Sequence, residues 1–269
     1  MSTHPEDRHP MLDQLSQLWR NKTAVAGLFI IAGFVLCGIL APVISPHDPI
    51  AVELYEQLKP PAWDEEGSTL NLLGTDDLGR DILSRIIYGA RVSLLVAVVS
   101  VGIAFCLGTI IGSVSGYYKG RLDDIVMRGI DIILSFPYIL LAIVVVAYLG
   151  PSLQNAMLAI AITYARAIGA RNLRIIFITI LPNCMGPLIV QTTLSFASAI
   201  LDAAALSFLG LGAQPPTPEW GADIARSRAL ILRASWVMTF PGLAILGAVL
   251  GFNLLGDGLR DALDQRLRD

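Results

Sequence analysis

Long apolar runs alternate along the chain with shorter polar segments, and this alternation predicts helices that cross a membrane. A helix crosses the hydrocarbon core of a bilayer with about 20 residues, at a rise of about 1.5 Å per residue. Runs of this length with few charged residues span positions 23–44, 91–116, 125–149, 186–209 and 236–255. We expect a transmembrane helix in each of them.

A further apolar run, Pro151–Tyr164, is too short to cross the bilayer alone. With only five crossings, the C-terminal arginines would lie outside, against the excess of Lys and Arg that inner segments carry. A junction between Tyr164 and Ala165 at which residues are missing restores a sixth crossing. The prediction is therefore an all-α polytopic membrane protein with six transmembrane helices and both termini in the cytoplasm.

Composition supports a membrane protein and excludes several other classes. The 269 residues are 54% hydrophobic and 15% charged, with a mean hydropathy of +0.64, far from the values of a soluble domain. The net charge of −3 gives no basic field that would attract nucleic acid. The cysteines form no Cys-x-x-Cys pair and the histidines lie far apart, so neither a disulfide framework nor a metal site is indicated.

These patterns divide the chain into four parts. Residues 1–21 form a polar cytoplasmic tail, and residues 22–87 form the first transmembrane helix and a polar outer segment. Residues 88–256 form the helical core, and residues 257–269 form a charged cytoplasmic tail. In the last apolar run, glycines at positions 247 and 251 predict a helix face on which a neighbouring helix packs closely.

The longest polar segment, Ser45–Tyr88, is net negative and contains several prolines, which favours the outer side. Near its end, Asp76, Asp77 and Asp81 surround a turn predicted at Thr75–Gly79, and a helix follows that continues into the membrane. Three carboxylates suggest a calcium loop, but the ligand spacing of an EF-hand is absent. We favour a solvated cap on the start of the helix.

Two acidic residues lie inside apolar runs. Asp131 is near the start of the run 125–149, in which Pro137 predicts a kink, and an ion pair or contact with inner headgroups explains it. Asp202 lies about 24 Å along its helix, in the outer half of the bilayer. An unpaired carboxylate there is costly, so Asp202 is the candidate for contact with a transported solute. A structural ion pair is the alternative.

A basic segment, Ala165–Asn183, follows the short apolar run. Its three arginines, the glycine at position 169 and the Leu-Pro pair at 181–182 predict two short helices joined by a turn at the inner membrane surface. On physical grounds alone, an ordinary positively charged inner loop explains the segment at least as well as a contact site for a cytoplasmic protein.

Recognisable catalytic motifs are absent from the sequence. It contains no P-loop, HExxH, GxSxG or Rossmann glycine pattern, so the chain is not expected to hydrolyse ATP or to be an enzyme. A permease subunit, a secondary transporter and a structural membrane subunit all fit these features. A proton-coupled carrier would need several intramembrane acids or a repeated pattern of broken helices, and two acids without an obvious repeat disfavour it.

Three motifs resemble those of ABC-importer permeases of the dipeptide, oligopeptide and nickel branch. They are LGTDDLGRDILSRIIYGARVSLL at 73–95, LSFLGLGAQPPTPEWG at 206–221 and GFNLLGDGLRDALDQRL at 251–267. Within this branch, the sequences at 60–68, 182–184 and 200–202 are similar to those of the second permease subunit of bacterial dipeptide importers. The resemblance extends from about Asn21 to the end of the chain.

This resemblance implies a type I ABC-importer permease fold and a role in ATP-driven import of dipeptides across the bacterial inner membrane. The implied partners are a homologous permease subunit, two cytosolic ATPase subunits and a periplasmic peptide-binding protein, besides membrane lipid. ATP and Mg²⁺ would bind to the ATPase subunits and no cofactor to this chain. Oligopeptides, haem and nickel are the alternative substrates.

The family also implies a role for the segment 165–183, which resembles the second half of the EAA loop that couples permeases to ATPases. The matching small residues and the Leu-Pro pair are Ala165, Ala167, Gly169, Leu181 and Pro182. The first half of the motif, including its Glu, is absent. Relative to the family, a few tens of residues are missing at this point.

We assign docking of the binding protein to the outer segments 73–85 and 214–220. Both segments are stiffened by turns, and both carry charged residues next to the ends of transmembrane helices. The candidate contacts are Asp76, Asp77, Arg80, Asp81, Pro216 and Trp220. The alternative is that these polar residues only cap the helices.

A bulky residue in the coupling segment tests its role. We expect Gly169→Trp to abolish peptide-stimulated ATP hydrolysis in the reconstituted transporter, because a helix that sits in a shallow groove of an ATPase subunit cannot accommodate an indole ring. Expression level and protease accessibility of the outer segment serve as controls for an unchanged topology. Normal stimulation in the variant would contradict the assignment.

Overall fold

A computed structural model describes residue 19 and residues 21–118, 120–155, 157, 160 and 181–264. Regular secondary structure in these residues is helical, apart from one isolated bridge between Thr75 and Asp81. The helices are α2 (Lys22–Ile44), η2 (Leu54–Glu56), α3 (Ile82–Tyr118), α4 (Arg121–Leu134), α5 (Tyr138–Leu149), α8 (Leu181–Phe208), α9 (Trp220–Ser227), η4 (Arg228–Leu230) and α10 (Trp236–Asp264). The prediction of an all-α protein is confirmed for this part of the chain.

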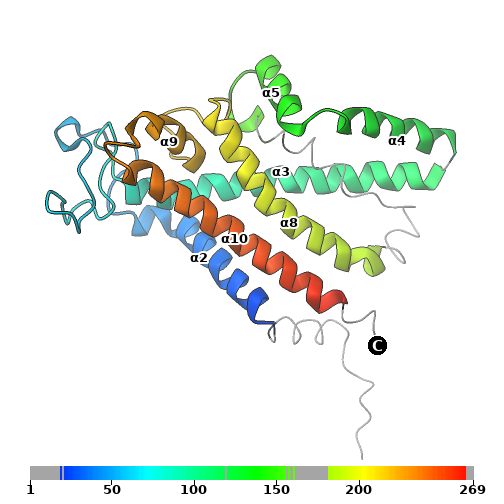
Figure 1. The fold of residues 1–269 in the computed structure, drawn as a ribbon. Coiled ribbons are helices and arrows are strands. Elements are labelled where there is room, and N and C mark those ends of the chain that lie inside the picture. Colours follow the sequence, from blue (N-terminus) through cyan, green and yellow to red (C-terminus); the bar gives the residue numbers. More distant parts are fainter. Residues whose placement is uncertain are drawn as a thin grey trace, which may run out of the picture.

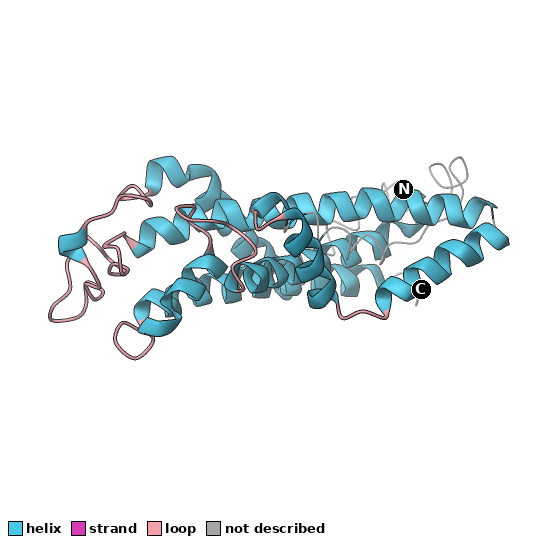
Figure 2. Ribbon diagram, turned by 90° about the horizontal axis from the view of Figure 1, so that it is seen from above, coloured by secondary structure: helices cyan, strands magenta, loops and turns pink. Residues whose placement is uncertain are grey.

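Four of these helices, α2, α3, α8 and α10, are long and apolar enough to cross a membrane. They form an elongated bundle in which α2 and α10 run antiparallel (Figure 1). At one end the Asn21 side-chain amide donates to Gly258 O at 3.5 Å, which places the start of α2 beside the end of α10. We call this the terminal end, and we call the opposite end, where the segment 45–81 lies, the loop end (Figure 2).

Helix α3 begins inside the polar outer segment and continues for 37 residues. At about 1.5 Å per residue it is about 55 Å long, well beyond the roughly 30 Å of a hydrocarbon core. The predicted run 91–116 is therefore the middle and end of a longer helix. Its first turns belong to the loop end, as the sequence predicted for the residues that follow the turn.

The run 125–149 is not the single kinked helix that we expected. Helix α4 ends at Leu134, and α5 starts only after Pro137, whose backbone is extended (φ −55°, ψ 128°). A proline disfavours helical geometry in the residue before it and cannot donate the next helical hydrogen bond, so the chain breaks here rather than bending. Asp131 is exposed on α4, which lies beside the far end of α3 (Figure 1).

The directions of the helices restrict the number of crossings. Helix α3 leaves the loop end, whereas α8 returns to it and leads into α9 (Figure 1). The end of α3 and the start of α8 therefore lie on the same side, and the chain between them must cross the membrane an even number of times. Four crossings or six satisfy this rule, whereas five crossings, which the distribution of positive charge already disfavoured, do not.

Two helix boundaries differ from the sequence-based ones. Helix α8 already includes Leu181 and Pro182, so it extends beyond the predicted start at Gly186. Helix α10 continues to Asp264, so the charged segment after Leu255 extends the last helix. Of the coupling residues, Leu181 and Pro182 lie in α8, and Ala165, Ala167 and Gly169 lie outside the described residues.

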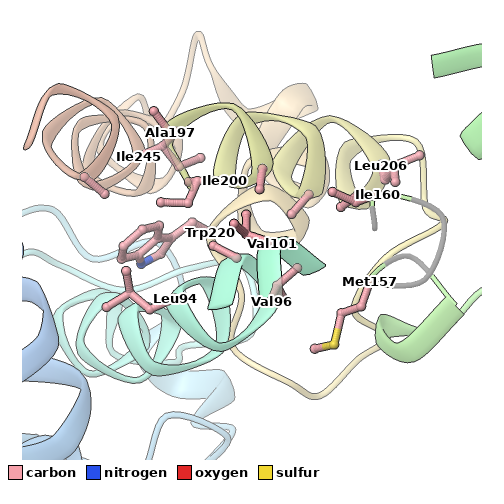
Figure 3. Close-up of a cluster of buried hydrophobic side chains, with 14 of the residues drawn as sticks. Leu94, Val96, Val101, Met157, Ile160, Ala197, Ile200, Leu206, Trp220 and Ile245 are labelled. Carbon is pink, nitrogen blue, oxygen red and sulfur yellow. The ribbon is translucent and has the colours of Figure 1, made fainter. Parts of the chain in front are cut away.

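The main apolar core lies where α3, α8, α9 and α10 meet (Figure 3). Trp220, at the start of α9, is fully buried there, with Leu94 of α3 and Ile200 of α8 in the same cluster. Its ring meets Phe34 of α2 edge-on at 5.6 Å between centroids. One aromatic side chain thus joins α9 to three of the long helices.

Close contact between α2 and α10 depends on glycine, as predicted for positions 247 and 251. A Cβ added at Gly247 would lie 3.2 Å from the Phe34 ring, and one at Gly251 would lie 2.8 Å from Ile30 Cγ2. On α2 itself, a Cβ at Gly27 would lie 2.5 Å from the backbone N of Leu255. The two backbones therefore approach too closely for a side chain.

Two glycines of α2 provide a matched test of this contact. Gly27→Ala is expected to destabilise the protein by about 1–3 kcal/mol, because the methyl group would overlap backbone atoms of α10. Gly33→Ala meets no atom within 4 Å and should be neutral or stabilising by up to about 1 kcal/mol through helix propensity. Thermal unfolding in detergent measures both. Equal midpoints for the two variants would show that α2 and α10 do not pack this closely.

Candidate functional site

The two outer segments that we assigned to docking lie together at the loop end. Arg85 of α3 pairs with Asp223 of α9, and the Trp236 indole N–H donates to Thr75 O at 3.3 Å. The first pair joins the start of α3 to the connection between α8 and α10, and the second joins the turn before α3 to the start of α10. The segments 73–85 and 214–220 thus lie at the same end of the bundle, and their role in docking stays a prediction.

The turn before α3 is closed by Asp76. Its Oδ1 accepts hydrogen bonds from the backbone N–H groups of Leu78 and Arg80, both at 2.9 Å. Its Oδ2 pairs with the Arg80 guanidinium at 2.6 and 2.7 Å. Gly79 has a φ of +72°, in the left-handed region that favours glycine. This geometry explains why the turn needs Asp, Gly and Arg at these spacings.

Asp81 performs a different task, at the start of α3. Its Oδ2 accepts from both the backbone N–H and the hydroxyl of Ser84, at 2.8 and 2.6 Å, and its Oδ1 accepts from the Asn71 side chain at 3.0 Å. It therefore caps the first turn of the helix. Asp76 and Asp81 are only 4% and 3% exposed, so the expected cap on the helix is present at Asp81 but it is buried and not solvated. Their oxygens already hold protein donors, and no metal-binding cluster occurs among the described residues.

Glu219 caps α9 from a buried position. Its carboxylate accepts from the backbone N–H groups of Gly221 and Ala222 at 3.0 and 2.8 Å. Burial raises the pKa of Glu219, and these two hydrogen bonds oppose the rise. The next residue, Trp220, donates from its indole to Ile86 O at 3.0 Å and rests on Gly89, where a Cβ would lie 2.6 Å from the ring.

Asp223 is the common partner of two arginines. Arg85 Nε donates to both carboxylate oxygens at 3.1 and 3.2 Å, and Arg226 donates to Oδ1 at 3.0 Å. Arg85 also donates to Pro49 O at 2.8 Å, which ties down the chain after α2. Burial raises the pKa of Asp223, and the charge of Arg85 opposes the rise. The sequence did not single out Arg85 and Asp223, because nothing local indicates a pair separated by 138 positions.

Burial divides the six predicted docking residues into two groups. Asp76, Arg80, Asp81 and Trp220 lie inside the loop end and hold it together, so none of them offers its side chain to a partner. Asp77, with a side chain that is 46% exposed, and Pro216 remain at the surface. Four of the six residues are therefore internal supports of the loop end, and docking of a partner on this face stays a prediction.

The remaining candidate, Asp202, is buried in α8, and it is not without an interacting partner. The premise that it is an unpaired carboxylate is therefore wrong. A partner removes much of the cost of burying the charge, which is the structural explanation that the sequence left open.

Comparisons with known proteins agree with this architecture. Residues 161–269 match the family described as binding-protein-dependent transport system inner membrane component. Residues 10–61 match the N-terminal TM domain of oligopeptide transport permease C. The di/tripeptide transport system permease protein DppC of Pseudomonas aeruginosa is 48% identical over 282 residues, covering 95% of this chain and 93% of the relative. The chain belongs to this family of transport permeases.

Other relatives of the permease carry similar names. The dipeptide transport system permease protein DppC of Escherichia coli K12 is 48% identical over 281 residues, with 94% of each chain covered. The probable D,D-dipeptide transport system permease protein DdpC of the same strain is 43% identical over 265 residues, covering 90% of the permease and 87% of the relative. Members of this family are membrane subunits for translocation and not enzymes, as expected from the absence of catalytic motifs.

The same alignments bear on the residues expected to be missing. The alignment with the Pseudomonas relative has 282 positions, whereas 95% of the permease is about 256 residues, which leaves about 26 positions without a counterpart. The alignment with the dipeptide transport system permease protein DppC of Haemophilus influenzae has 281 positions. It includes 94% of this chain, about 253 residues, which leaves about 28 positions without a counterpart. The relatives thus contain a few tens of residues that the permease lacks.

Removing one partner of the buried ion pair tests its importance. Arg85→Gln is expected to destabilise the permease by about 3–5 kcal/mol, because Asp223 would lose its main compensating charge in a buried position. The control is Lys59→Gln, which removes a pair with Glu56 that lies at the surface of the same loop end and should cost less than about 1 kcal/mol. Tryptophan fluorescence during thermal unfolding in detergent measures both variants. A loss for Arg85→Gln no larger than the control would contradict the inferred role.

Proposed function

We propose that this chain is the permease subunit of an ABC importer that moves dipeptides across the bacterial inner membrane. The observation that carries the proposal is the 48% identity to relatives named dipeptide permeases, over nearly the full length of both chains. The alignments cover both the apolar spans and the loop end, so they support a translocation path built in the same way as in these relatives.

The proposed complex contains a homologous permease subunit, two cytosolic ATPase subunits and a periplasmic binding protein. Six crossings with both termini in the cytoplasm agree with the even number that the directions of α3 and α8 require. They also place the net-negative segment 45–81 outside and the basic segment 165–183 inside, as the distribution of positive charge favours.

In this arrangement the permease forms the translocation path and the contact surfaces for its partners, and it catalyses no reaction. ATP and Mg²⁺ bind to the ATPase subunits, and the coupling segment receives their movement at the inner surface. The loop end, held together by buried ion pairs and by Trp220, presents a stiff face to the binding protein. Stiffness reduces the entropy lost on docking, so a weakly bound partner can still dock in a defined orientation.

Oligopeptides are the second candidate substrate. The match of residues 10–61 to the N-terminal domain of an oligopeptide permease supports this alternative, although it covers only the tail, α2 and part of the outer segment. None of the relatives described above is named for nickel or haem.

Transport by the reconstituted complex tests the substrate. The permease is purified with the subunits that co-assemble with it and reconstituted in proteoliposomes with ATP and the cognate binding protein. We expect ATP-dependent uptake of a labelled dipeptide, with much weaker uptake of a pentapeptide or of Ni²⁺. Preferred uptake of the pentapeptide would favour the oligopeptide alternative, and uptake without ATPase subunits would exclude an ABC importer.

Charge reversal at the surface tests the docking face. We expect Asp77→Lys to weaken binding of the loaded binding protein several-fold at low ionic strength, because Asp77 keeps an exposed charge on this face. Asp257→Lys is the matched control, since Asp257 is also exposed but lies near the terminal end of α10. Unchanged affinity of the Asp77 variant, measured by surface plasmon resonance, would place docking elsewhere.

A further inference from the structure

An apolar tip projects from the loop end between η4 and α10. Its two residues are Ile231, which is 51% exposed, and Leu232, which is 100% exposed. Exposed arginines flank them, Arg228 on one side and Arg233 on the other. The tip thus combines apolar side chains with two positive charges, and the core packing of the chain uses neither of its apolar side chains.

The chain on both sides of the tip is firmly held. Leu230 and Ala234 pack into a small apolar cluster with Ile82 and Val237, which joins the starts of α3 and α10. The backbone N–H groups of Arg233 and Ala234 both donate to Leu230 O, at 2.9 and 2.7 Å. The turn is therefore closed, and Leu232 is displayed at its apex instead of folding back onto the cluster.

The level of the tip along the bundle follows from α2. The apolar residues Val43 and Ile44, at the end of α2, are exposed, so the apolar surface of the bundle reaches this level. Three residues on, the backbone N–H of His47 donates to Ser84 Oγ in the first turn of α3. The cluster that anchors the tip includes Ile82, only two residues before Ser84. The tip therefore lies close to the edge of the apolar belt, where headgroups surround the protein.

The charges near the tip favour a negatively charged surface. Neither Arg228 nor Arg233 has an acidic partner within 4.0 Å in the part of the chain that the structure describes. The exposed charged residues of the segment 45–81, by contrast, are all acidic: Asp48, Glu53, Asp64, Glu65, Glu66 and Asp77. The two arginines thus give the tip a positive charge, whereas the neighbouring segment 45–81 has a negatively charged surface.

We propose that the tip at Ile231 and Leu232 inserts into the headgroup region of the bilayer at the loop end, with Arg228 and Arg233 bound to lipid phosphates. Apolar side chains between cations are typical of segments that lie at a membrane interface. Attraction of arginine to an anionic lipid surface is strongest when the side chain lies within the headgroup layer. The inserted tip would hold the start of α10 at a fixed depth. This inference does not depend on the transported substrate.

A spin label at the tip measures its surroundings. Cys37, Cys106 and Cys184 are replaced by alanine, and Leu232→Cys is labelled with a nitroxide in the transporter purified with its co-assembling subunits and placed in nanodiscs. Tyr55→Cys is the matched control, because Tyr55 is also 100% exposed but lies on the acidic segment 45–81 and has no arginine beside it in the sequence. Both substitutions replace side chains that the rest of the chain does not cover, so folding should be preserved.

Collision rates with oxygen and with a water-soluble nickel chelate distinguish the outcomes. At position 232 we expect oxygen to collide more often than the chelate, and at position 55 the reverse. In nanodiscs that contain phosphatidylglycerol, the label at 232 should move deeper than in phosphatidylcholine alone, and Arg228→Gln with Arg233→Gln should remove this shift. A chelate-accessible label at 232 would overturn the proposal, as would a label shielded from both reagents by another protein subunit. A depth independent of anionic lipid would overturn the role of the arginines.

Discussion

The structure of the loop end depends on one constraint: the carboxylate of Asp223 is buried and must be compensated. Arg85 supplies the compensating charge from α3, and Arg226 adds a second one from α9 itself. A buried carboxylate without these partners would destabilise the fold by several kcal/mol. Since Arg85 also binds Pro49 O, a single guanidinium fixes the positions of α9, α3 and the chain that leaves α2.

Around this ion pair, further buried contacts also fix the helices and turns of the loop end relative to one another. Asp76 and Arg80 close the turn before α3, Asp81 caps its first residues, and Trp220 fills the space beside Gly89. Each contact satisfies a buried polar group or fills a gap between helices, so none can be removed without leaving an unpaired group or a cavity. The loop end is therefore expected to move as a rigid body when a partner binds to it.

The sequence predicted what depends on local pattern. Apolar runs located α2, α3, α8 and α10, the turn at Thr75–Gly79 was recognised from its residues, and the paired glycines of α10 do contact α2. It failed where the answer depends on distant neighbours. Asp76 and Asp81 were predicted to be solvated, because donors such as Asn71, which reaches Asp81, approach only in the folded chain. At Pro137 the sequence predicted a kink within one helix, whereas the helix ends before this proline and a new one begins after it.

The unusual length of α3 has a mechanical consequence. From Arg85 to Tyr118 it is a continuous helix of about 50 Å without a proline, so a sharp kink is not expected along it. If α9 shifts at one end, the rod tilts about its contacts with α2 and α8 rather than absorbing the movement. For a pivot at the middle of the helix, a tilt of about 5° displaces each end by about 2 Å in opposite directions, so α3 acts as a lever that carries a small movement from one side of the membrane to the other.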